Sequence, residues 1–255
     1  MLANDLSGQI VATMQSWVGR NEHDGSYLEI LRIYNSFRPL PRCYPLKPSD
    51  EWCAGTVSSA GIINGCADII HPECGVEEMA RLYMPEKRFV TNKTYVPHPG
   101  HIVMYDWHCC GWGDHVGIVE KVDGSDVIAI EGNRHSAVAR RRFPVGWKYI
   151  RGYALPDYEA KAARFSVEAL AQKGVINSPD YWSSVVSEDS VPGLRLLVGL
   201  ASNAIVMAGP RTETVEEGLQ RLMQAGVTGE PEYWMQAAAQ VPNVGELIKA
   251  LGGCV

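Results

Sequence analysis

The chain has 255 residues, is 46% hydrophobic and 20% charged, and carries a formal net charge of −6. These values indicate a globular protein with one large domain or two modest ones, each able to bury a core. No basic run is long enough to follow a phosphate backbone, which argues against a nucleic-acid partner. No apolar run approaches the roughly 18 residues of a membrane-spanning helix, which argues against membrane insertion.

The N-terminal residues and the cysteines bear on the cellular compartment. Residues 1–18 hold charged Asp5 and polar Gln9 and Gln15, where a signal peptide requires an apolar run. The seven cysteines are too sparse for a disulfide scaffold, and only a Cys66–Cys74 bridge stays open on spacing. We therefore expect a protein made in the cytoplasm, with reduced thiols.

Helical patterns come first along the chain. Residues 10–18 and 27–35 have apolar side chains at helical spacing, and the small, apolar residues 53–64 are typical of a buried helix. Strand patterns follow. Candidate strands lie at residues 100–106, 115–122, 127–131, 140–143 and 149–153, joined by short turns. Short turns between strands favour an antiparallel sheet, so the predicted class is α+β, with helices packed on an antiparallel sheet.

Composition changes near Pro156. All seven histidines lie at or before His135, and residues 1–155 hold 16 basic and 17 acidic side chains, against 7 and 12 in residues 156–255. We predict a first domain over 1–155 and an all-helical region over 156–255.

The helical region contains an internal repeat, with units at about 166–200 and 214–251. Residues 170–175 recur at 222–227, and residues 179–182 recur at 231–234, both 52 residues further on. Each unit is expected to form a helix that ends at glycine, a turn, and a second helix that begins at proline. Two such helix pairs bury their apolar faces on each other, or self-associate with a second copy.

Trp182 and Trp234 occupy equivalent positions in the two units. One interpretation places them in a core, where aromatic side chains contribute most of the buried area. The other places them on a surface that binds sugar or peptide. The acidic net charge of the region disfavours teichoic acids as its ligand.

Cys53 has the position of an activated thiol. It follows Trp52 at the predicted start of the buried helix. The positive end of a helix dipole stabilises a thiolate, and the free N–H groups there can hold an oxyanion. A base is then required within hydrogen-bond reach, and a further group must orient that base. His115 begins one predicted strand and Glu131 ends the next, so antiparallel pairing makes the two neighbours.

Several motifs resemble those of CHAP domains, the cysteine amidohydrolase/peptidase branch of the papain-like peptidoglycan hydrolases. The resemblance covers about residues 10–155, and its motifs are Trp52-Cys53-Ala54, residues 114–119 around His115, and Ile130-Glu131-Gly132-Asn133. Further matching segments lie at residues 34–36, 68–74, 100–103, 105–107 and 150–153. The tail repeats are similar to helical units behind such domains in phage endolysins and Gram-positive cell-wall lysins.

The resemblance implies a role for each motif residue. Cys53 would be the nucleophile, His115 the proton carrier, Glu131 the group that orients His115, and Asn133 a fourth polar group at the imidazole or the oxyanion. The substrate would be an amide bond in bacterial peptidoglycan, cleaved through a thioester without a cofactor. Candidate substrate-binding residues are Trp52, Trp112, Asp114, Trp182 and Trp234.

The chain departs from the family pattern at two places. His101 stands where the family often has Asp, and residues 47–51 offer too few oxygen ligands for the calcium site of some members. We expect no required calcium and no other metal, since the Cys and His of residues 108–112 match no standard zinc spacing. Residues 140–142, three arginines, are expected to form a solvated strand with one arginine pointing inward.

Three functions stay open on the sequence. The first is an endolysin-like wall hydrolase, either an N-acetylmuramoyl-L-alanine amidase or an endopeptidase, that acts on the wall after release from the cell. The second is a cytoplasmic cysteine amidase with a small amide substrate. The third is a non-catalytic wall-binding or assembly protein.

Overall fold

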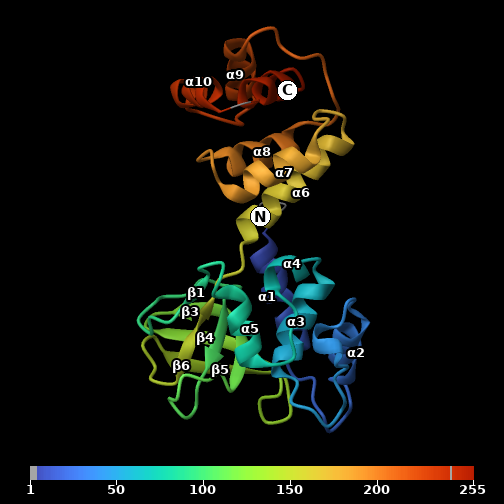
Figure 1. Ribbon diagram of the computed structural model, residues 1–255, viewed down its shortest axis with the longest axis vertical. Helices are drawn as coiled ribbons and strands as arrows, with labels where there is room; N and C mark the ends of the chain where they lie inside the picture. Colours follow the sequence, from blue (N-terminus) through green and yellow to red (C-terminus); the bar gives the residue numbers. More distant parts are fainter. Residues whose placement is uncertain (1–4, 242) are drawn as a thin grey trace. The chain divides into compact units, whose positions relative to one another are not determined.

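The computed structural model describes residues 5–241 and 243–255 (Figure 1). The described chain forms two compact units, one of residues Asp5–Asp157 and one that holds Tyr158–Val255. The division falls two residues after the end of the predicted first domain. Among the described residues, no helix is both long enough and apolar enough to cross a lipid bilayer.

The first unit begins with helices. They are α1 (Leu6–Trp17), α2 (Leu28–Ser36), α3 (Cys53–Ile63), α4 (Ala67–Ile70) and α5 (Val76–Tyr83), with a 3₁₀ turn at Pro41–Cys43. In Figure 1 the blue and cyan helices gather on one side of this unit and the green strands on the other. The sequence patterns predict α1, α2 and α3 but not α4 and α5. α4 has only four residues, and the buried face of α5 carries a charged side chain, Glu77, that interrupts its apolar pattern.

Helix α3 is the central helix of this unit. All nine of its residues from Cys53 to Gly61 are buried. Its small residues let neighbouring segments approach closely, because a Cβ atom added at Gly61 would lie 2.6 Å from the side chain of Ile70. The helix packs on α2 and on strand β3, so it is held on both sides.

The strands form one six-stranded antiparallel sheet in the order β1-β6-β2-β3-β4-β5. Their bounds are β1 (Phe89–Val90), β2 (Ile102–Tyr105), β3 (His115–Asp123), β4 (Asp126–Glu131), β5 (Ala139–Pro144) and β6 (Ile150–Ala154). The five longer strands match the five predicted ones, and β1 was missed because two residues show no periodicity. The predicted α+β class, with helices packed on an antiparallel sheet, is confirmed.

The strand register places the ends of three strands together. Tyr105 pairs with His115, and Gly117 pairs with Glu131. Gly117 makes room for the glutamate, because a Cβ atom there would lie 2.7 Å from Cγ of Glu131. The start of β3 and the end of β4 therefore lie side by side.

The second unit contains six helices among its described residues. They are α6 (Tyr158–Gln172), α7 (Pro179–Glu188), α8 (Leu194–Ala204), α9 (Val215–Gln224), α10 (Pro231–Gln240) and α11 (Val244–Gly252). Each repeat thus has three helices rather than the expected two. The third helix was missed because α8 and α11 begin 50 residues apart, not 52, so the repeat loses its constant offset there. A single apolar cluster joins both repeats and includes Trp182 and Trp234.

Candidate active site

Cys53 is the first residue of α3, and its side chain is almost completely buried. Trp52 stands at the helix cap and is fully buried, with its indole Nε1 donating a hydrogen bond to Glu22 Oε1 at 2.9 Å. Its ring packs against Tyr27, with centroids 5.2 Å apart. The prediction that Trp52 touches substrate is therefore wrong: a fully buried ring offers no surface, and Trp52 instead supports the start of α3.

His115 is the first residue of β3 and lies next to Glu131, with its Nε2 atom 3.1 Å from Glu131 Oε2. The ring stacks on Tyr105 at a centroid distance of 5.9 Å. Burial lowers the pKa of His115, but hydrogen bonds to the Cys53 thiol and to Glu131, together with their negative charges, outweigh burial and raise the pKa to about 9. The imidazole therefore holds its proton at neutral pH.

Glu131 ends β4 and is completely buried. Burial raises its pKa, but hydrogen bonds from His115 and Arg141 more than offset that effect and leave the pKa below its ordinary value. The Nε atom of Arg141 lies 2.7 Å from Oε1, and the Nε atom of Arg134 lies 3.7 Å from Oε2. A buried carboxylate with these partners is ionised at neutral pH.

Arg141 is a site residue that the sequence motifs do not name. Its guanidinium carbon lies 4.9 Å from the ring centroid of Trp107 and 5.3 Å from that of Tyr105. Arg140 and Arg142 instead form ion pairs on the other side of the strand, with Glu120 and with Asp123 and Asp126. Because side chains alternate between the two faces of a strand, the middle arginine of the three points to the face opposite its neighbours. Knowledge that β5 pairs with β4 would have identified Arg141 as the arginine on the same face as Glu131.

Asn133 lines the cavity beside His115, and its side chain has a partner outside the predicted triad. Its amide nitrogen donates to the Glu51 carboxylate, and no hydrogen bond joins it to His115 in the described structure. This contact ties the segment after β4 to the segment before Cys53. Gly132, in the same segment after β4, lies against α3 itself, since a Cβ atom there would lie 1.9 Å from Oγ1 of Thr56. Asn133 thus lies near the site as a link between segments rather than as a partner of the imidazole.

Asp114 and Trp112 belong to the loop before β3. The Asp114 carboxylate accepts hydrogen bonds from the backbone N–H of Trp107 at 2.7 Å and from His108 at 3.2 Å, so it orders this loop. Trp112 is half exposed, and the Arg81 guanidinium lies 5.1 Å from its ring centroid. Trp112 alone among the first unit's substrate-binding candidates presents a large open aromatic surface.

A cavity of about 310 Å³ opens beside the imidazole. It is lined by Trp107, His115, Asn133, Arg134, His135 and Arg141. Two guanidinium groups in its wall favour a ligand that carries a carboxylate. The cavity therefore combines a flat aromatic surface with positive charge next to His115.

The remaining thiols show no pairing. None of the seven cysteines forms a disulfide, so the Cys66–Cys74 bridge that the spacing left open is not formed. The Cys109-Cys110 loop is held by Asp106, whose carboxylate accepts from the backbone N–H of Cys110 at 3.1 Å and of Gly111 at 2.6 Å. Within the described residues, no three His, Cys, Asp or Glu side chains gather as a metal site would require.

A thiol at a helix start beside an imidazole and carboxylate on neighbouring strands is the arrangement found in thiol-dependent hydrolases. Comparison with protein families agrees with that class: residues 47–133, about a third of the chain, match the family model of the CHAP domain. The matched span includes Cys53, His115 and Glu131. This segment of the first unit is therefore similar to a CHAP domain. Searches against curated proteins and against solved structures find no match.

Proposed function

We propose that this protein is a cell-wall hydrolase that cleaves an amide bond of bacterial peptidoglycan. The observation that carries the proposal is the contact of the His115 imidazole with the buried Glu131 carboxylate at 3.1 Å, together with the interaction with Cys53 that helps to raise the pKa of His115. Cys53, His115 and Glu131 all lie inside the segment that matches the CHAP domain. The match supports amidase or peptidase chemistry, and the three side chains supply the groups for it.

In the first half of the reaction, the Cys53 sulfur attacks the carbonyl carbon of the amide. His115 carries a proton at neutral pH, because its pKa is raised to about 9, and is the proton donor of the site. The N–H groups of the first turn of α3 have no partner within the helix and are available to the oxyanion. When the C–N bond breaks, His115 gives its proton to the leaving amine and a thioester to Cys53 remains.

In the second half, water attacks the thioester carbon and His115 accepts a proton from it. The C–S bond breaks, the product leaves as a carboxylate, and the pair of Cys53 and His115 returns to its starting state. Glu131 stabilises the imidazolium and fixes the ring orientation throughout. The cationic cavity beside His115 is suited to the free carboxylates of peptide stems.

An endolysin-like role, with wall access after release, is the biological setting we propose for this chemistry. The helical unit would then serve as a wall-targeting or self-assembly module. A cytoplasmic amidase with a small amide substrate is the second candidate, favoured only by the small size of the cavity near His115.

Purified peptidoglycan tests the proposal. The wild-type chain should reduce the turbidity of a wall suspension, and Cys53→Ala should abolish this while leaving the circular-dichroism spectrum and melting temperature unchanged. Mass spectrometry of the released fragments would show whether the cleaved bond joins muramic acid to the stem or lies within the peptide. Activity on small amides without any wall cleavage would favour the second candidate. Stable wall binding by a chain that cleaves neither substrate would contradict both.

A further inference from the structure

The second unit contains two equivalent pockets. One has a volume of about 460 Å³ and the other of about 640 Å³, both within the range of roughly 300–1,000 Å³ typical of small-ligand sites. In each pocket one wall comes from the turn before the second helix of one repeat and the opposite wall comes from the third helix of the other repeat. Each repeat thus supplies half of both pockets.

The aromatic and apolar residues that line the two pockets occupy equivalent positions in the two repeats. Tyr181 and Trp182 line the first pocket where Tyr233 and Trp234 line the second. Each Tyr–Trp pair meets edge to face, with centroids 5.0 and 5.1 Å apart and an interplanar angle of 79° in both. On the opposite walls, Leu247 of α11 corresponds to Leu197 of α8. The two pockets therefore share one aromatic and apolar framework.

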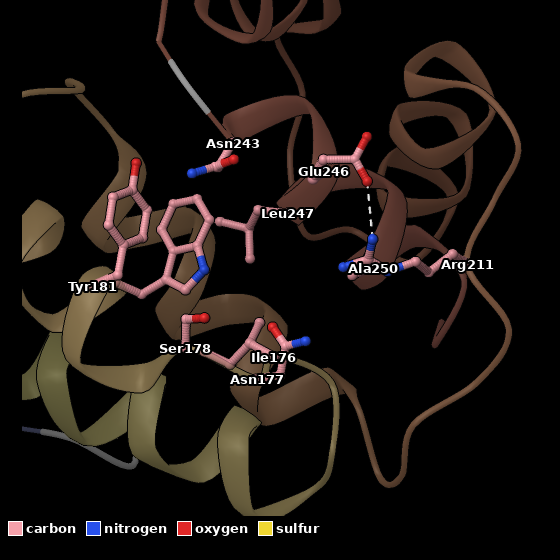
Figure 2. Close-up of a pocket in the computed structure, with 10 residues that line it drawn as sticks. Ile176, Asn177, Ser178, Tyr181, Arg211, Asn243, Glu246, Leu247 and Ala250 are labelled. Atoms are coloured by element: carbon pink, nitrogen blue, oxygen red, sulfur yellow. Dashed lines mark hydrogen bonds and ion pairs between the residues drawn. The ribbon is translucent and has the colours of Figure 1, made fainter.

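The two pockets differ in their polar groups. The first pocket has Asn177, Asn243 and Glu246 where the second has Gly229, Gly193 and Leu196. Figure 2 shows Asn243 and Glu246 across the pocket from Asn177 and Ser178, with Tyr181 at its edge. Side-chain amides line only the first of these two pockets, whereas each pocket has one carboxylate in its wall, Glu246 in the first and Glu230 in the second.

These polar groups are available to a ligand. No hydrogen bond of the described structure uses the side-chain amide of Asn177 or Asn243, and the Ser178 hydroxyl caps no helix N–H. An amide both donates and accepts, which suits hydroxyl and acetamido groups. Glu246 is already paired with Arg211 and Lys249, at 2.9 Å in each case, so its negative charge is compensated within the protein.

We propose that the first pocket, lined by Tyr181, Asn177, Asn243 and Glu246, binds an uncharged N-acetylated sugar of the wall glycan. A sugar of this kind has an apolar face for the aromatic and aliphatic floor, and hydroxyl and acetamido groups for the rim. Residues 156–255 hold 12 acidic and 7 basic side chains, a balance that repels anionic wall polymers. The inference rests on the proposed wall function and names the ligand through which the second unit serves it.

Binding is measured on the full-length Cys53→Ala chain, so that no hydrolysis interferes. The probe is chitotetraose, a chain of four N-acetylglucosamine units, titrated by calorimetry or by tryptophan fluorescence. Saturable binding to one site is expected. Asn243→Gly combined with Glu246→Leu gives the first pocket the residues of the second at these two positions and should weaken binding at least tenfold. Glycine is tolerated at position 243, because Asn243 has a positive φ of 68°.

The second pocket supplies the matched control. Thr228→Ala and Glu230→Ala change its lining and should leave the affinity for chitotetraose unchanged. Melting curves check that each variant is folded. The inference is overturned if the folded chain shows no saturable binding at millimolar sugar, or if the control variants weaken binding equally. It is also overturned if stem peptides or teichoic acid fragments bind and chitotetraose does not.

These outcomes are separable from those of the proposed function. A wild-type chain that hydrolyses soluble muropeptides but does not bind chitotetraose removes the sugar site alone. A chain that binds chitotetraose through the first pocket but cleaves no peptidoglycan removes the hydrolase proposal alone.

Discussion

Arg141 and His115 bond to opposite oxygens of one buried carboxylate. Arg141 Nε lies 2.7 Å from Oε1 of Glu131, and His115 Nε2 lies 3.1 Å from Oε2. When His115 gives its proton to a leaving group, Glu131 thus retains a permanently charged partner. The carboxylate can stay ionised through both halves of the reaction, which keeps the imidazole orientation constant.

Removal of the Glu131 charge should change the pH profile. His115 has a pKa of about 9, raised in part by Glu131, so the imidazolium and its activity should be lost above about pH 9. Glu131→Gln removes one of the groups that raise this pKa, so the alkaline limb of kcat/KM should move to lower pH. The rate should also fall by on the order of 10², as for other third members of such triads. A variant within twofold of wild type, with an unmoved limb, would show that another group orients His115.

Arg141→Met tests the second partner of the carboxylate. Loss of one member of a buried ion pair typically costs about 3–5 kcal/mol, so the free energy of unfolding should drop by an amount of this order. The rate should fall as well, because Glu131 keeps only His115 and the more distant Arg134. Arg142→Met is the control on the same strand, since Arg142 pairs with Asp123 and Asp126 at the surface. Equal effects of the two substitutions on stability and rate would contradict the role given to Arg141.

His101 should make the fold sensitive to acid. Its Nδ1 atom accepts from the backbone N–H of His98 at 3.1 Å, and burial lowers its pKa to about 4. Because the folded pKa lies below the unfolded value of about 6.5, the unfolded chain binds the extra proton and stability falls as pH drops from 6.5 toward 4. His101→Asn should reduce the slope of the unfolding free energy against pH in this range, by an amount equivalent to up to one bound proton.

The first unit should fold alone if its last residues are kept. Leu155 donates its backbone N–H to Arg88 O at 2.9 Å, and the Asp157 carboxylate pairs with the Arg88 side chain. A fragment that ends at Asp157 should therefore melt at a higher temperature than one that ends at Leu155. It should cleave soluble muropeptides at the rate of the full chain but be slower on intact walls, because it lacks the tethering of the second unit. Equal rates on intact walls would rule out targeting by the second unit.

Trp182 and Trp234 should stabilise the second unit. They are 6% and 4% exposed, within an apolar cluster that spans both repeats. Truncation of a buried Trp to Ala typically costs about 3–5 kcal/mol, so Trp182→Ala should melt this unit at a clearly lower temperature. Unchanged melting together with lost wall affinity would instead support the surface interpretation. Tyr181→Ala, at a partly exposed ring, is the comparison with the smaller expected cost.

The sequence predicted the parts of the fold in which local periodicity and burial agree. The five longer strands and helices α1 and α2 show enough of a pattern to be recognised, α3 is recognised by its small apolar residues, and antiparallel order alone brings His115 beside Glu131. Strand β1 and helix α4 are too short for any period to show. In α5, Glu77 is buried because Arg151 neutralises it at 2.9 Å, and a sequence pattern cannot show that partner.

Parts of the candidate site depend on contacts between distant segments. The bond from Asn133 to Glu51 joins residues on separate loops, and no motif spacing indicates it. Arg141 lies among three consecutive arginines, and only the pairing of β5 with β4 distinguishes the inward one from its neighbours. In the second unit, the walls of each pocket come from both repeats, so a comparison of one repeat with the other does not reveal them.

Because each pocket of the second unit takes its walls from both repeats, a binding site can pass to another protein only if both repeats are transferred together. A single repeat contains half of each pocket and the whole of neither, so one copy transferred to another protein would carry no binding site. The functional unit of exchange is the tandem pair. Two pockets on one apolar framework also allow substitution in one of them. The polar residues of one pocket can change while the apolar contacts of the other continue to hold the two repeats together.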